Sequence, residues 1–182
     1  MRFLARYELF KKQINIKGSI IECGVHHGSG VMAWAKLSAA LEPYALHRRI
    51  IGFDTFEGFC HIANEDRTSV ESKQNKELQV GGFSTEHDVY EELQELIKEF
   101  DDNRYLNQFP KVFLVKGDAT ETIPKYVEEN PHLLVSLLFL DFDLYEPTKV
   151  ALEYFLPRMC KEQLLPLMKL IIFGGQVRHK LY

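Results

Sequence analysis

The fold is decided by residues 18–30, which read GSIIECGVHHGSG. Residues 18–23 are a short apolar run punctuated by glycine, which is typical of a strand buried in a parallel sheet. A glycine-rich turn follows at once. From Ser29 onward apolar residues recur every three or four positions, which predicts a helix that Ser29 caps and Pro43 ends. The stretch therefore predicts a strand, a turn and a helix in direct succession.

The same order of elements recurs along the rest of the chain. Further strands are predicted at residues 49–53, 111–116, 133–140 and 169–173. Helices are predicted at residues 1–13 with an apolar face of Phe3, Tyr7 and Phe10, at about 85–100, at 121–129 with Thr120 as cap, and from Pro147 onward. Five strands alternating with helices indicate an α/β protein with a doubly wound, Rossmann-like, mostly parallel sheet.

Composition and charge limit the organisation and the partners. The 182 residues are 46% hydrophobic and 26% charged, which suits one domain over residues 1–182, with an N-terminal helix in 1–17 and an insertion plus helix in 61–100. The formal charge of -4 and the lack of a lysine or arginine block argue against nucleic acid. Without an apolar run of about 18 residues, a signal peptide or paired cysteines, we expect a cytoplasmic protein that does not enter a membrane.

The glycine turn lies where open α/β sheets bind ligands, at the carboxyl end of a strand. Its spacing, G-x-x-x-G-x-G, matches neither the dinucleotide fingerprint nor a phosphate loop. Glu22 precedes the turn, and its carboxylate would repel a pyrophosphate and suit a cation better. Nucleotide hydrolysis is therefore disfavoured, and a nicotinamide-dependent dehydrogenase is kept only as a minor alternative.

Acids at three strand ends, Glu22, Asp54 and Asp118, resemble the cofactor pocket of class I S-adenosylmethionine (SAM) methyltransferases. The resemblance implies that Glu22 and the turn lie near the methionine part of SAM, that Asp54 accepts from the ribose hydroxyls and that Asp118 accepts from the adenine amino group. For each lone aspartate, the alternative is a helix cap or a turn. The full set of cofactor-binding residues that the resemblance implies is Glu22, Gly24, Val25, His26, Gly28, Ser29, Asp54, Thr55, Asp118, Ala119 and Asp141.

Two further stretches, GFDTFEGF at residues 52–59 and FLDFDLYEPT at 139–148, are similar to the macrocin O-methyltransferase (TylF-type) family. That family methylates hydroxyls on sugars of macrolides and related natural products. The resemblance implies a small-molecule acceptor, SAM, and Mg²⁺ held by Asp141, with Asp143 beside it. His61 is the candidate general base for the acceptor hydroxyl, since a histidine titrates near neutral pH, and the alternative is a loop histidine without a catalytic role. The alternative is that Asp141 and Asp143 only end a strand and cap a helix.

The end of the chain departs from the family pattern. Where the family has an acidic pair that completes the metal site, this chain reads MKLIIFGGQ at residues 168–176 and stops at Tyr182. We expect a truncated or frameshifted product that lacks the last strands, unless an insertion or a second subunit supplies the missing acids. A non-catalytic SAM-binding module is the rival function. The uncovered fifth strand also predicts self-association into a homo-oligomer.

Overall fold

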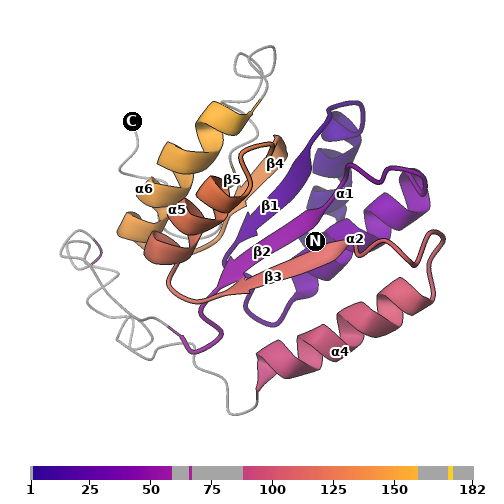
Figure 1. The fold of residues 1–182 in the computed structure, drawn as a ribbon, viewed down its shortest axis with the longest axis horizontal. Coiled ribbons are helices and arrows are strands. Elements are labelled where there is room, and N and C mark those ends of the chain that lie inside the picture. Colours follow the sequence, from indigo (N-terminus) through magenta and orange to yellow (C-terminus); the bar gives the residue numbers. More distant parts are fainter. Residues whose placement is uncertain (1, 59–65, 67–87, 160–171, 174–182) are drawn as a thin grey trace.

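A computed structural model describes residues 2–58, 66, 88–159 and 172–173 (Figure 1). In chain order the elements are α1 (Arg2–Gln13), β1 (Ser19–Cys23), α2 (Ser29–Leu41), β2 (Ile50–Asp54), α4 (Val89–Asp102), β3 (Val112–Lys116), α5 (Ala119–Glu129), β4 (Val135–Leu140), α6 (Tyr145–Phe155), the 3-10 turn η2 (Leu156–Arg158) and β5 (Ile172–Phe173). The predicted strands are all present, and their boundaries differ from the prediction mostly by one or two residues.

The strands form one parallel sheet in the order β3-β2-β1-β4-β5. The chain winds outward from β1 to β3, then returns to the other side of β1 with β4. The order therefore reverses between β1 and β4, which is where doubly wound sheets bind their ligands. This topology confirms the predicted fold class.

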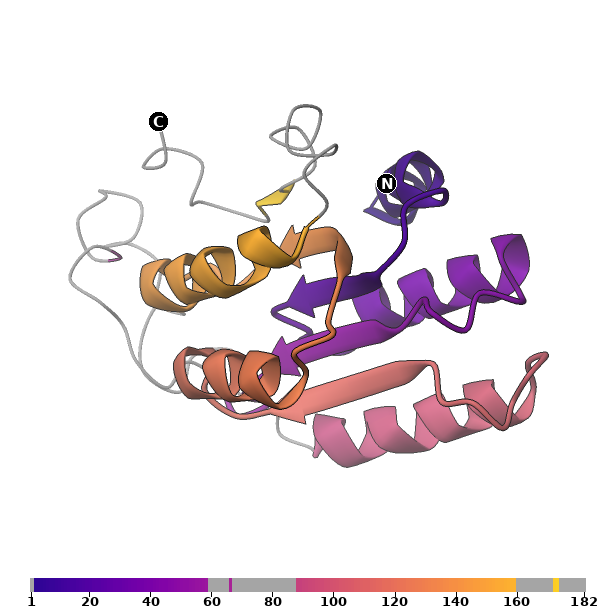
Figure 2. The same ribbon diagram turned by 45° about the horizontal axis from the view of Figure 1, so that its top comes forward.

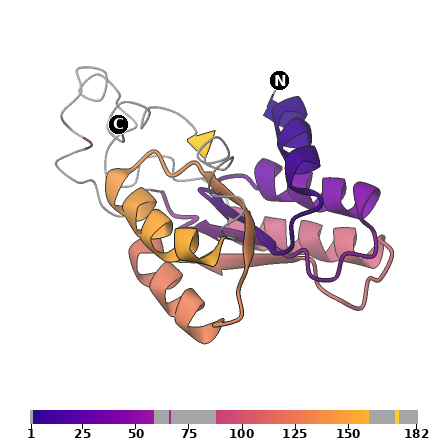
Figure 3. The same ribbon diagram turned by 90° about the horizontal axis from the view of Figure 1, so that it is seen from above.

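Helices cover both faces of the sheet (Figures 2 and 3). Helices α5 and α6 pack together on one face, while α2 and α4 lie on the other and α1 packs beside α2. Strands β1 and β4 are buried along their whole length, because each has a neighbouring strand on both sides and helices above and below. Within the described residues, no helix is both long and apolar enough to cross a bilayer.

The helix starts differ from the predicted ones. Gly28, in a left-handed conformation, occupies the N-cap of α2, so Ser29 is the first helical residue and not the cap. Asp118, not Thr120, caps α5, because its carboxylate accepts from the Thr120 amide at 2.8 Å. Helix α6 begins at Tyr145, ahead of Pro147, since proline fits within the first turn of a helix, where its missing N–H has no partner to lose.

The buried face of α1 is also not the predicted one. Phe10 is fully buried as expected, but Phe3 is 54% exposed. Arg6 and Gln13 are buried instead, so two polar side chains share the packed face with Phe10. A pattern of apolar residues cannot reveal this face, because half of it is polar.

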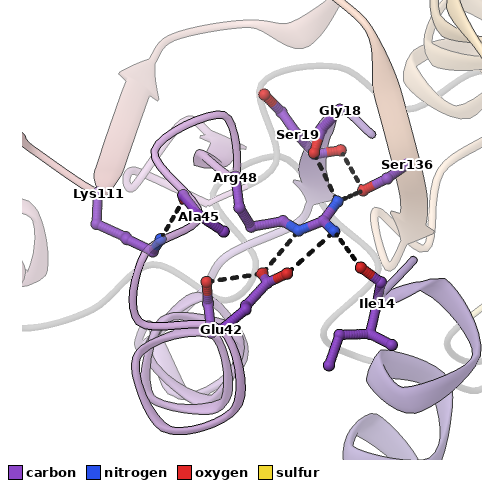
Figure 4. A network of polar contacts seen from close by, with 9 residues as sticks. Ile14, Gly18, Ser19, Glu42, Ala45, Arg48, Lys111 and Ser136 are labelled. Atoms are coloured by element: carbon purple, nitrogen blue, oxygen red, sulfur yellow. Dashed lines mark hydrogen bonds and ion pairs between the residues drawn. The ribbon is translucent and has the colours of Figure 1, made fainter. Parts of the chain in front are cut away.

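At the amino ends of the strands, a buried arginine joins several segments (Figure 4). Arg48 is fully buried and donates to the Glu42 carboxylate at 2.8 and 3.2 Å. It also donates to the carbonyls of Gly18 and Ile14 and to the hydroxyl of Ser136. This network fixes the start of β1 and β4 at the edge opposite to the glycine turn.

Candidate functional site

The carboxyl ends of the central strands are joined by backbone hydrogen bonds. Cys23 at the end of β1 is in register with Phe53 of β2 and Leu140 of β4. The Gly24 amide donates to the Phe53 carbonyl at 2.9 Å, and the Asp141 amide donates to the Cys23 carbonyl at 2.7 Å. The glycine turn, residues 24–30, therefore begins between the strand ends that carry Asp54 and Asp141.

Asp54 holds the glycine turn through its carboxylate. One oxygen, Oδ2, accepts from the Val25 amide at 2.6 Å and from the His26 amide at 2.8 Å. The other, Oδ1, accepts from the Phe56 amide at 2.8 Å. A carboxylate has about four acceptor positions, so these bonds leave room at Oδ1 for one further donor. Asp54 both shapes the turn and can bind a hydroxyl.

Each glycine of the turn makes room for a specific neighbour. A Cβ atom at Gly24 would strike the backbone of Asp141, and one at Gly28 would strike the side chain of Leu93 from α4. A Cβ at Gly30 would strike the Glu22 carboxyl group. Gly24 and Gly28 also have φ angles of 88° and 78°, which favour glycine. The turn therefore packs against the residue after β4, against α4 and against Glu22, with no space for side chains at these three positions.

Backbone strain is concentrated at this edge. Four residues other than glycine have positive φ, and three of them, His26, Phe56 and Asp143, follow the ends of β1, β2 and β4. Such conformations cost about 1–3 kcal/mol each and gather at functional sites. The strain marks the same edge that the glycine spacing indicated.

Glu22 lies beneath the turn and is 1% exposed. Burial raises the pKa of its carboxyl group to about 8, while the Arg6 guanidinium, 3.4 Å away, opposes that rise. The sequence indicated that a cation would suit the position beside Glu22. In the structure the Arg6 guanidinium of α1 is that cation. The assigned role of Glu22 near a bound methionine group stays a prediction.

The two histidines of the turn, His26 and His27, are both exposed, and their rings meet edge to face with centroids 4.2 Å apart. Partial burial is the main cause that lowers the pKa of His26, with a further contribution from His27. A neutral imidazole there can accept or donate a hydrogen bond. Cys23, in contrast, is fully buried, and burial raises the pKa of its thiol well above the usual value, so it is not a nucleophile at neutral pH.

Asp118 lies at the end of the next strand and serves as a helix cap. Its Oδ1 accepts from the amide and the hydroxyl of Thr120. Among the described residues no hydrogen bond engages its other oxygen, which remains able to accept from a ligand. The helix-cap alternative from the sequence therefore holds, and it does not exclude the predicted adenine contact.

The remaining predicted cofactor residues fall into two groups. Val25 and Ala119 have buried side chains, so they would contact a cofactor through backbone groups. Ser29 is exposed at the start of α2. The Thr55 hydroxyl donates to the Gly58 carbonyl at 2.6 Å and so stabilises the turn after β2. His61, the predicted base, lies outside the described residues.

The candidate metal ligands lie at the end of β4. Asp141 and Asp143 follow β4, yet the described residues contain no group of three histidine, cysteine or acidic side chains able to hold an ion. One carboxylate with waters binds Mg²⁺ weakly. Asp66, the described residue of the insertion, accepts from the Tyr145 amide at 2.9 Å and so ties the insertion to the start of α6. The described residues therefore do not amount to a magnesium site.

Sequence reasoning missed the residues that support the site from outside the motifs. Arg6 of α1 contacts Glu22, and Leu93 of α4 packs under Gly28. The ring of Tyr90, also on α4, lies beside Phe56 with centroids 5.2 Å apart. For Arg6 the sequence offers only its helical spacing with Phe10 and Gln13. That pattern is also typical of an exposed helix face with polar and apolar residues.

Comparisons with known proteins agree with the fold. The family model described as macrocin-O-methyltransferase (TylF) matches residues 8–165. A crystal structure of CalS11, a calicheamicin methyltransferase, is 33% identical with a TM-score of 0.81, over 88% of this chain and 60% of that one. The apo structure of CalS11, named there as a TDP-rhamnose 3'-O-methyltransferase of calicheamicin biosynthesis, is 30% identical with a TM-score of 0.70, over 88% and 58%.

A third structure, the O-methyltransferase NovP, is 21% identical with a TM-score of 0.59 over 87% of this chain and 60% of that one, and it shows the fold alone. None of the curated proteins compared with the chain matches it. The chain spans 60% of the length of the CalS11 structure that it resembles.

Proposed function

The chain belongs to the macrocin O-methyltransferase (TylF) family, and from this premise we propose that it binds SAM at the glycine turn and transfers a methyl group to a sugar hydroxyl. A bound SAM supplies an electrophilic methyl group on a sulfonium. The observation that carries the proposal is Asp54, whose carboxylate holds the turn and keeps an acceptor position at Oδ1. The acceptor class follows from CalS11, which acts on TDP-rhamnose.

The residues of this chain bind and orient the two reactants. Asp54 accepts from a ribose hydroxyl, Asp118 accepts from the adenine amino group, and the turn 24–30 lies along the methionine part. Positioning alone can contribute much of the rate of a transfer between two bound reactants. The acceptor hydroxyl must also lose its proton, and we assign that proton to His61 as general base.

Magnesium is a further part of the proposal. Asp141 is the residue that would hold Mg²⁺, where the ion would lower the pKa of a coordinated hydroxyl. The described residues bring no group of three ligands together, so no step of the reaction is assigned to the metal. The second candidate is a SAM-binding module without catalysis. For either function we expect a cytoplasmic protein that self-associates and binds small molecules.

The test is calorimetric titration of the purified chain with S-adenosylhomocysteine, SAM and NADH, each with and without Mg²⁺. We expect micromolar binding of the first two ligands and none of NADH. A folded chain that binds neither SAM nor S-adenosylhomocysteine would refute the proposal, and binding of NADH alone would favour a dehydrogenase. Formation of S-adenosylhomocysteine from SAM with TDP-rhamnose would exclude the non-catalytic module.

A matched pair of variants ties binding to the site. Asp54→Asn removes the charge of the ribose acceptor, and we expect it to weaken S-adenosylhomocysteine binding at least about tenfold. Asp88→Asn is the control, because Asp88 caps α4 and asparagine caps a helix equally well. Equal affinity for the Asp54→Asn variant and the wild type would remove Asp54 from the site.

A further inference from the structure

Helix α1 places one charged side chain beside the cofactor edge. Arg6 is 7% exposed, and its guanidinium donates to the Glu22 carboxyl at 3.4 Å. The same group lies over the rings of Phe139 and Trp34, at 4.9 and 5.7 Å from their centroids. Arginine is rarely buried without partners, so this side chain is fixed by one acceptor and two aromatic faces.

The partner of Arg6 lies directly under the glycine turn. Glu22 is in the last part of β1, and its carboxyl group fills the space where a side chain at Gly30 would be. Gly30 is in the first turn of α2, so the position of the carboxyl group limits how closely the turn and the helix approach the sheet. A contact therefore runs from α1 through Glu22 to Gly30.

We propose that Arg6 is a positioning residue of the cofactor site, which holds the Glu22 carboxyl group under Gly30 and thereby fixes the turn 24–30. The expected effect on ligand affinity rests on the proposed function. The expected effect on the conformation of the turn does not depend on it. The inference makes α1 part of the site, although no residue of α1 belongs to the recognised motifs.

The surroundings of Glu22 explain why it needs this partner. Burial is the largest influence on its pKa and disfavours the ionised form, and Arg6 is the largest opposing influence. Without the guanidinium, a carboxyl group among apolar side chains loses its donor and must turn toward another one. Its other stabilising neighbour is the Trp34 side chain, which belongs to α2 as Gly30 does. A displaced carboxyl group therefore disturbs the turn itself.

The experiment compares three variants of α1. Arg6→Met keeps an apolar stem of similar length and removes the donor, Arg6→Lys keeps a cation, and Lys11→Met is the control. Lys11 is on the same helix, but its ion pair with Glu8 is exposed. Amide hydrogen exchange of Val25 and His26 reports the turn without any ligand, and titration with S-adenosylhomocysteine reports the site.

For Arg6→Met we expect amide exchange in the turn about tenfold faster and S-adenosylhomocysteine affinity about tenfold weaker than in the wild type. Arg6→Lys should recover part of both effects, and Lys11→Met should change neither. Wild-type exchange in a folded Arg6→Met variant would overturn the inference, because packing alone would then explain Arg6. If the wild type binds no S-adenosylhomocysteine, the proposed function is refuted. The comparison of amide exchange between Arg6→Met and the wild type then still tests the role of Arg6.

A double variant covers the case in which Arg6→Met does not fold. Arg6→Met with Glu22→Met replaces the whole polar pair by apolar groups, a change that proteins often tolerate. Since the double variant also lacks the carboxyl group under Gly30, the inference predicts faster exchange of the turn amides. Exchange at the wild-type rate would overturn it.

Discussion

Replacing Glu22 with glutamine should change how stability depends on pH. The free carboxyl group of an unfolded chain has a pKa near 4.5, whereas burial raises the pKa of Glu22 to about 8 in the folded protein. Between these values the folded state binds a proton that the unfolded state has lost. The free energy of unfolding therefore falls as pH rises from 4.5 to 8. Glutamine carries no such proton, so the variant lacks this slope.

The size of the effect follows from the same two values. Each pH unit in that window costs the wild type about 1.4 kcal/mol, which adds up to roughly 5 kcal/mol across the window. The full burial of Glu22 means that solvent does not screen this contribution. A buried lysine does not interfere, because burial lowers the pKa of Lys111 to about 8 and its effect lies above the window.

Urea unfolding at pH 5, 6, 7 and 8 measures the free energy for both proteins. We expect the stability of the wild type minus that of Glu22→Gln to fall steadily over this range. The control is Glu8→Gln, which removes an exposed carboxylate from α1 and should show no comparable slope. A difference between wild type and Glu22→Gln that stays constant with pH would refute the reasoning, since the carboxyl group would then titrate alike in both states.

Two substitutions and one sedimentation measurement test other parts of the fold. Gly30→Ala should destabilise the protein by about 1–3 kcal/mol in thermal unfolding, because the new Cβ would strike Glu22. The neighbouring change Ser29→Ala should have little effect on stability. A stabilised Gly30→Ala variant would contradict this expectation. Arg48→Met should lower the free energy of unfolding by about 3–5 kcal/mol, because Glu42 loses its buried partner; a loss below about 1 kcal/mol in urea would contradict this. Self-association through the β5 edge should appear in sedimentation, and a monomer at micromolar concentration would count against it.

The sequence predicted the part of the site that local patterns determine. A strand that ends in a glycine turn and continues as a helix has few possible geometries, so the place of Gly24, Gly28 and Asp54 followed from spacing. Parallel strands also bring their carboxyl ends to the same edge of a sheet. The sequence therefore predicted that the turn after β1 lies beside Asp54 at the end of β2, 30 residues along the chain. The structure adds that Asp54 serves the backbone of the turn before it serves any ligand.

The residues that support the site could not be predicted in the same way. Arg6 and Glu22 are 16 residues apart, and Arg48 and Ser136 are 88 apart, so no local period connects them. A buried polar side chain also breaks the apolar pattern from which a helix face is predicted. For α1 the apolar pattern placed Phe3 on the buried face, whereas the structure exposes Phe3 and buries Arg6.

Buried polar pairs lie at both ends of β1, and they differ in what they can do. At the amino end, Arg48 binds two carboxylate oxygens, two carbonyls and a hydroxyl, so its charge is fully compensated and the segment is held firmly. At the carboxyl end, Arg6 has one hydrogen bond, at 3.4 Å to the Glu22 carboxyl group, and lies over the rings of Phe139 and Trp34. The strand is therefore anchored at both ends, and the pair at its carboxyl end lies under the turn where the ligand is proposed to bind.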